Sequence, residues 1–144
     1  MLLPTILYGD HISRMHPVAA EYEDSVIRIE GQLGVARSGR NRGNHVPQRV
    51  ANVREQSMHM YTVLTNLLFL LHCSNWQRRY ADFLLENLDP ESKESLSSYL
   101  DDDQALVTLQ LRQEVKHMAS ESESIESLLK QLRSRLEKQL DVVS

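Results

Sequence analysis

The chain has 144 residues and a formal net charge of −4, with 41% hydrophobic and 25% charged residues. This composition is ordinary for a soluble globular domain and excludes both a collagen-like chain and wholesale disorder. A single cysteine, Cys73, excludes a disulfide scaffold. Only five glycines and four prolines disfavour a β fold rich in tight turns, so we expect an all-α protein.

The first fourteen residues contain Pro4 and Gly9 and show no sustained hydrophobic period. We therefore predict an N-terminal arm or short helix over 1–16, followed by one helical domain over 17–144. Pro17 suits the first position of a helix, which we place at about 17–36. Its apolar residues recur three or four positions apart, as in a coiled-coil seam: Met15, Val18, Tyr22, Val26, Ile29, Leu33 and Ala36.

Residues 37–47 are rich in Gly, Asn and Arg and end at Pro47, which predicts a basic loop. The next helix is expected at about 48–73 and to form the centre of the core, because its second half is apolar nearly all round. Its predicted seam alternates steps of three and four: Val50, Val53, Ser57, Met60, Leu64, Leu67 and Leu71.

Ser74-x-x-Gln77 has the form of a capping box, so we expect a break there and a new helix over about 75–88. The alternative is one helix whose apolar face rotates. Asp89 followed by Pro90 predicts a short helix over about 90–100. The new helix carries a different stripe: Trp76, Tyr80, Phe83, Leu84 and Leu88.

A last, long helix is predicted over about 103–142, and its stripe runs through Thr108, Leu111, Val115, Met118, Ser122, Ile125, Leu129, Leu132, Leu136 and Leu140. Forty residues make a helix of about 60 Å, whereas a compact domain of this size is only about 38 Å across. We therefore predict an elongated helical bundle of four to five helices with coiled-coil character and a long C-terminal helix. The helical seam predicted to bind a partner is Ile125, Leu129, Leu132, Leu136 and Leu140.

No arrangement of residues indicates a reaction. Glu114 and His117 form a single E-x-x-H, whereas di-iron bundles need two such motifs. No phosphate loop, dinucleotide fingerprint or nucleophile elbow is present. We expect no catalytic, cofactor or metal site, and no enzyme.

No stretch is long enough to predict a transmembrane segment, and the first residues do not resemble a secretory signal. We expect an intracellular protein, cytoplasmic or nuclear. Ser120 has an acid three residues on, a pattern that an acid-directed kinase reads, although a solvated polar helix face is the simpler interpretation.

The basic region carries five arginines without an acid, and these are the candidate contacts to an anionic partner. A solvated loop joining two helices is the simpler interpretation. The five are Arg37, Arg40, Arg42, Arg49 and Arg54.

These patterns predict a non-enzymatic scaffold or adaptor subunit that assembles through helical coiled-coil packing into a homo- or hetero-oligomeric complex. Its partners are proteins, either a second copy or another helical subunit. The first alternative is a nucleic-acid-associated protein that uses the Arg-rich segment 37–54. The second is a helical-bundle enzyme or metal-binding protein.

Overall fold

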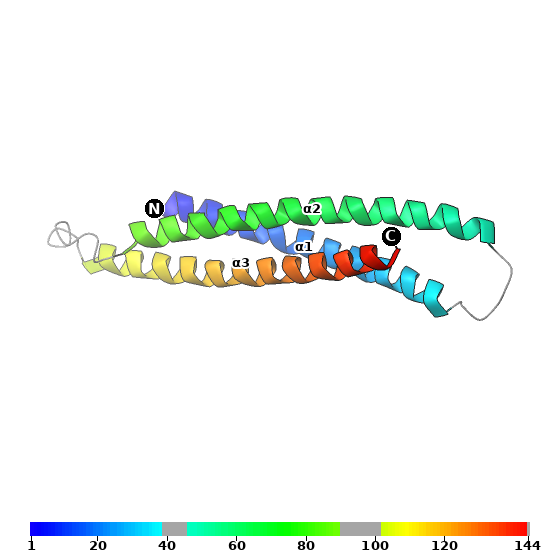
Figure 1. Ribbon diagram of the computed structural model, residues 1–144. Coiled ribbons are helices and arrows are strands. Elements are labelled where there is room, and N and C mark those ends of the chain that lie inside the picture. Colours follow the sequence, from blue (N-terminus) through cyan, green and yellow to red (C-terminus); the bar gives the residue numbers. More distant parts are fainter. Residues whose placement is uncertain (39–45, 90–101, 144) are drawn as a thin grey trace. The chain divides into compact units, whose positions relative to one another are not determined.

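The computed structural model describes residues 1–38, 46–89 and 102–143, and for 34–38 and 46–52 it describes the backbone alone. The described residues are almost entirely helical and form α1 (Leu2–Ser38), α2 (Val46–Asn87) and α3 (Asp102–Val143) (Figure 1). The all-α prediction is confirmed. The described part of the chain contains three helices where four to five were expected, and the helix predicted over 90–100 lies outside it.

The prediction that a helix starts at Pro17 is wrong, because α1 begins at Leu2 and contains Pro17 in its interior. A proline in the interior of a helix removes one backbone hydrogen bond, and for this reason the sequence favours a helix that begins at Pro17. Packing overrides the local penalty. Buried positions three or four residues apart precede Pro17 and continue after it: Thr5, Tyr8, Ile12, Met15 and Ala19.

The break predicted at Ser74 is also absent, and α2 is one continuous helix. Ser74 and Gln77 are both fully buried, at positions that a hydrophobic pattern alone does not assign to the core. Leu64 and Leu71 of the predicted seam are only half-buried. The buried positions of α2 keep one phase, which Leu88 continues directly after the helix: Met60, Val63, Leu67, Leu70, Ser74, Gln77, Ala81 and Leu84.

The long C-terminal helix is confirmed, because α3 spans Asp102–Val143 against the predicted 103–142. Thr108, Leu111 and Met118, in the first half of its predicted stripe, are half-buried. The remaining members of the stripe are buried: Val115, Ser122, Ile125, Leu129, Leu132, Leu136 and Leu140.

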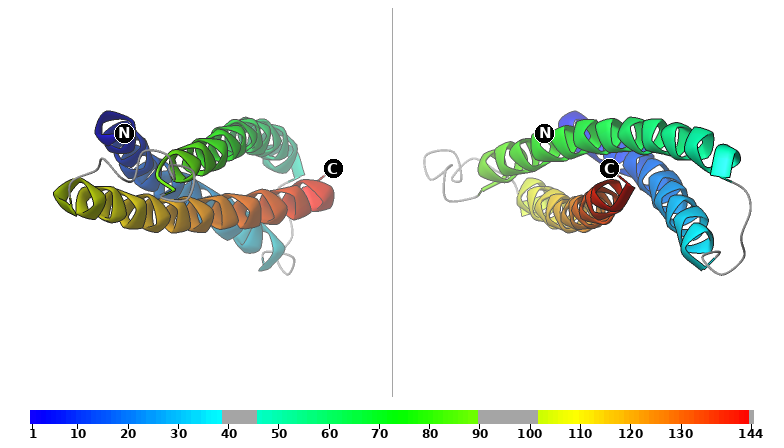
Figure 2. Two further views of the ribbon diagram at one scale, coloured as in Figure 1. Left: turned by 90° about the vertical axis from the view of Figure 1, so that its left-hand side faces the viewer. Right: turned by 45° about the vertical axis from the view of Figure 1, so that its right-hand side comes forward.

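The chain divides into two compact units, and each helix contributes to both. Unit 1 consists of residues 1–16 and 72–126, and unit 2 of residues 17–71 and 127–144. The division falls at Pro17 in α1, inside the helix that Figure 2 shows in two further views.

In unit 1, α1 and α2 run antiparallel, because Tyr8 contacts Tyr80 while His11, further along α1, contacts the earlier residue Trp76. Gly9 brings α1 close to α3: a Cβ atom at this position would lie 3.0 Å from the sulfur of Met118. The largest fully buried side chains of this unit are Tyr8, Ile12, Gln77, Leu84, Leu88 and Val115.

In unit 2, α1 and α3 are joined by an ion pair at the edge of the core. The Arg135 guanidinium donates from Nε and Nη2 to the two carboxylate oxygens of Glu30, at 2.9 and 2.5 Å. These hydrogen bonds hold the pKa of Glu30 below its ordinary value. The largest fully buried side chains of unit 2 are Val26, Met60, Leu67, Leu129, Leu132 and Leu136.

Candidate protein-interaction surface

The first two turns of α1 are apolar on the outside as well as on the inside. Leu2, Leu3, Ile6 and Leu7 are each 56–66% exposed, while Tyr8 behind them is buried. A helix that is apolar all round is normally surrounded by other structure. This part of unit 1 instead presents consecutive large apolar side chains to solvent.

A row of aromatic side chains on α2 lies next to this part of α1. Trp76 stacks on Tyr80 with ring centroids 5.1 Å apart and planes 12° from parallel. Tyr80 in turn stacks on Phe83, at 6.1 Å and 27°. The spacing of four and then three residues places these rings on one side of α2. Trp76 and Phe83, at the two ends of the row, are 52% and 51% exposed.

Tyr80 connects the aromatic row to α1. Its ring lies 5.8 Å from the ring of Tyr8, and its hydroxyl donates a long hydrogen bond of 3.5 Å to the carbonyl oxygen of Pro4. The edge of Trp76 meets His11 at 5.6 Å and 90°. Contacts with Tyr8, Pro4 and His11 therefore hold the aromatic row of α2 against α1.

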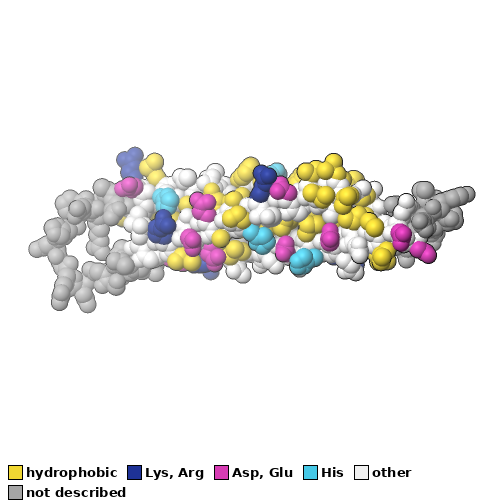
Figure 3. Space-filling model, turned by 180° about the vertical axis from the view of Figure 1, so that it is seen from behind, with side chains coloured by type: hydrophobic (Ala, Val, Ile, Leu, Met, Phe, Trp, Pro, Cys, Tyr) yellow, Lys and Arg dark blue, Asp and Glu magenta, His cyan; other side chains and the backbone are white. Residues whose placement is uncertain are grey.

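Six exposed side chains of α1 and α2 in unit 1 form what we call the exposed apolar surface. Figure 3 shows hydrophobic side chains gathered in a broad patch on unit 1. Exposed charges of both signs lie close to the patch in the sequence. Asp10 and Arg14 form an ion pair of 3.0 Å on α1, and Arg79 and Asp82 lie between the exposed rings of α2. The surface consists of Leu2, Leu3, Ile6, Leu7, Trp76 and Phe83.

A buried polar cluster lies behind the surface. The Ser122 hydroxyl donates to Oε1 of Gln77 at 3.0 Å, and Arg78 pairs with the buried carboxylate of Glu126. The Tyr8 hydroxyl is buried without a hydrogen-bond partner among the described residues. Burial raises the pKa of Tyr8 above its ordinary value.

The seam that the sequence assigned to a partner packs within the chain. Its five side chains are 0–8% exposed, so they form core against the chain's own helices. A partner that binds the chain in this state therefore needs a different surface. The five are Ile125, Leu129, Leu132, Leu136 and Leu140.

The five arginines proposed to contact an anion fall mostly where side chains are not described. Arg37 and Arg49 lie on the described backbone of α1 and α2, and Arg40 and Arg42 lie outside the described residues. Arg54 is exposed on α2. A role in binding an anionic partner stays a prediction.

Glu114 and His117 do not form a pair among the described contacts. The imidazole of His117 instead lies 3.5 Å from the carboxylate of Glu121. The imidazole of His16, on α1, lies 3.9 Å from the same carboxylate. Ser120, on the same stretch of α3, is exposed, and its carbonyl accepts a hydrogen bond from the Ser124 hydroxyl. Within the described residues, no three His, Cys, Asp or Glu side chains are grouped so as to hold a metal ion.

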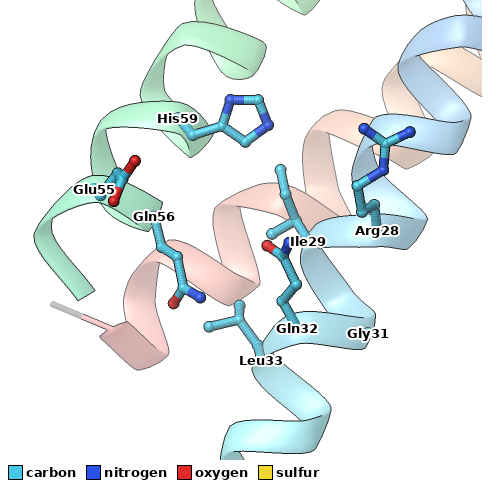
Figure 4. A pocket seen from close by; sticks show the side chains of 8 residues that line it. All are labelled: Arg28, Ile29, Gly31, Gln32, Leu33, Glu55, Gln56 and His59. Atoms are coloured by element: carbon cyan, nitrogen blue, oxygen red, sulfur yellow. The ribbon is translucent and has the colours of Figure 1, made fainter. Parts of the chain in front are cut away.

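Unit 2 contains an open cavity of about 710 Å³ between α1 and α2. Its lining combines charged, amide and aliphatic side chains, which Figure 4 shows projecting from the two helices. This mixture does not select one ligand chemistry. The cavity is lined by Arg28, Ile29, Gly31, Gln32, Leu33, Glu55, Gln56 and His59.

The hydrophobic pattern assigned Trp76 and Phe83 to the same stripe as Leu84 and Leu88, yet the first two are exposed and the last two buried. Extending the phase of the buried residues backwards from Leu84 separates the two groups. The apolar run at the start of α1 is a second sequence feature from which the exposed apolar residues could have been predicted.

Comparison of the chain with models of protein families, with curated proteins and with solved structures finds no significant match. Among the described residues, none of the helices has a window both long and apolar enough to cross a membrane.

Proposed function

We propose that the protein is a non-enzymatic scaffold or adaptor subunit that assembles with other helical chains. The observation that carries the proposal is the exposed apolar surface of unit 1. Six large apolar side chains there are each more than half exposed. Together they present on the order of 500 Å² of apolar surface, at the upper end of what a typical monomer exposes in its largest patch.

The chemistry of the surface favours a protein partner. Aromatic side chains are enriched in protein interfaces, and Trp in particular often contributes much of the binding energy. The rings of Trp76, Tyr80 and Phe83 hold one another in place, so little side-chain freedom remains to be lost on binding.

The shape of the surface favours a helical partner. Its side chains come from two neighbouring antiparallel helices, and such a pair presents ridges and grooves that accept a third helix. Coiled-coil packing at this contact is part of the proposal, because the exposed rings of α2 recur at Trp76 and Phe83, one heptad apart.

Affinity capture from the cells that produce the protein tests this function. The bait is the full chain, as wild type and as a double variant with Trp76→Gln and Phe83→Gln. The matched control replaces two exposed apolar residues of α2 in unit 2, Met58→Gln and Tyr61→Gln, at 64% and 56% exposure. We expect the wild type and the control to recover the same stoichiometric protein partner, and the Trp76/Phe83 variant to lose it. Recovery of that partner by all three baits would refute the proposed role of this surface.

A further inference from the structure

Provided that the proposed function holds, the area of the exposed apolar surface and the charges around it indicate which partner binds there. A standard protein interface buries about 800 Å² on each partner, of which roughly 60% is apolar. The apolar part of such an interface is therefore close to the area, on the order of 500 Å², that the six side chains present. The surface is large enough for a stable dimer without further apolar contacts.

The charges around the surface do not favour an anionic membrane or a strongly charged partner. Lipid-binding helices carry Lys and Arg along the border of their apolar face. Here Asp10, Asp82 and Glu86 on α1 and α2 are matched in number by Arg14, Arg78 and Arg79, so the border is not predominantly basic. Mixed charges of this kind suit a partner that carries the same mixture.

The order of the charges along α2 makes this face complementary to itself. Arg79 follows Trp76, whereas Asp82 immediately precedes Phe83 and Glu86 follows it. When two copies of this helix lie antiparallel, the basic part of one faces the acidic part of the other, and Trp76 faces Phe83. A parallel arrangement would place like charges opposite each other, which disfavours it.

We propose that the exposed apolar surface of unit 1 binds the same surface of a second copy of this chain. The two copies are related by a two-fold axis that crosses α2 between Trp76 and Phe83. The contact is isologous, so one association covers both apolar surfaces. Arg79 of each copy lies near Asp82 of the other, and this polar pairing sets the antiparallel direction.

Sedimentation of the full chain over a range of concentrations tests the proposal. We expect a dimer that dissociates on dilution. Trp76→Gln should raise the dissociation constant at least tenfold, while the control Met58→Gln should leave it unchanged. Circular dichroism verifies that each variant remains helical, which is expected because both side chains are more than half exposed.

Charge exchange tests the direction of the contact. Arg79→Glu alone and Asp82→Arg alone should each weaken the dimer, and the double variant Arg79→Glu/Asp82→Arg should restore it. A dimer that is insensitive to Trp76→Gln, or that the double exchange fails to restore, overturns the proposed geometry.

The remaining outcomes separate this inference from the proposed function. A monomer at all concentrations that still binds a different helical protein through Trp76 overturns the second copy as occupant and leaves the scaffold function intact. A monomer that binds phospholipid vesicles, or one with no association that depends on Trp76, overturns both.

Discussion

At the residue scale, the core of unit 1 contains polar groups whose pairing decides what they contribute. The Ser122 hydroxyl donates to Oε1 of Gln77 at 3.0 Å, whereas the Tyr8 hydroxyl and Nε2 of Gln77 are buried without a hydrogen-bond partner among the described residues. A buried hydroxyl without a hydrogen bond gives up its hydration without compensation. The sequence alone did not predict this cluster, because Ser and Gln are normally assigned to the surface.

The first prediction concerns Tyr8 and its pH dependence. Because burial raises the pKa of the folded-state phenol above 10.0, its contribution to stability is fully present below about pH 10 and is lost as the pH rises through the folded-state pKa. Tyr8→Phe should therefore reduce the alkaline fall in the free energy of unfolding. At pH 7 the change should be neutral or stabilising, because the hydroxyl has no partner.

Urea unfolding at pH 7 and at pH 10.5 measures both effects, with Tyr61→Phe as the control, because Tyr61 is 56% exposed. If Tyr8→Phe destabilises the protein at pH 7 by more than about 1 kcal/mol, the Tyr8 hydroxyl makes a hydrogen bond in the folded protein, which contradicts this prediction.

The second prediction uses two glycines of α1. Gly31 has nothing within 4 Å of where a Cβ atom would lie, so Gly31→Ala should raise the free energy of unfolding by about 1 kcal/mol. At Gly9 the added methyl would meet the Met118 sulfur at 3.0 Å, which offsets part or all of the same gain. Thermal unfolding of both variants should rank Gly31→Ala above wild type and above Gly9→Ala. The reverse order would show that α1 and α3 are not in close contact at Gly9.

At the element scale, hydrophobic spacing predicted α3 almost to its ends, because its core positions from Leu129 to Leu140 are all leucine. The same reasoning failed on α2, where Ser74 and Gln77 occupy core positions and made the pattern appear to break. It also failed at Pro17, where a local rule for starting a helix is overridden by packing on both sides. Local signals are thus least reliable where tertiary contacts satisfy an unfavourable residue.

The third prediction tests the phase of α2. Leu67 is fully buried and its neighbour Leu68 is 44% exposed. Leu67→Ala should cost about 2–5 kcal/mol of a typical total of about 5–15 kcal/mol. Leu68→Ala, with the same chemistry on the outer face, should cost clearly less, and Lys138→Ala on α3 almost nothing. Equal losses for Leu67→Ala and Leu68→Ala in denaturant unfolding would mean that the buried face of α2 is assigned wrongly.

At the scale of the whole molecule, the surface left for a partner depends on which apolar residues the chain itself covers. The sequence correctly indicated a helical protein with long apolar seams, but it assigned the partner-binding role to Ile125–Leu140, which the chain's own helices cover. Six apolar residues of α1 and α2 remain exposed on unit 1. Periodicity predicts that a face is apolar, and only the packed structure determines whether the covering surface belongs to the same chain.

The last prediction uses Trp76 as a reporter of the proposed contact. It is the chain's one tryptophan, and it lies on the exposed apolar surface at 52% exposure. Acrylamide quenching of its fluorescence, measured from high to low protein concentration beside sedimentation, therefore reports whether this surface is covered. We expect weak quenching in the dimer and several-fold stronger quenching as the dimer dissociates. Strong quenching that is the same at every concentration would contradict the proposed contact, because Trp76 would then lie in solvent whether or not the chains associate.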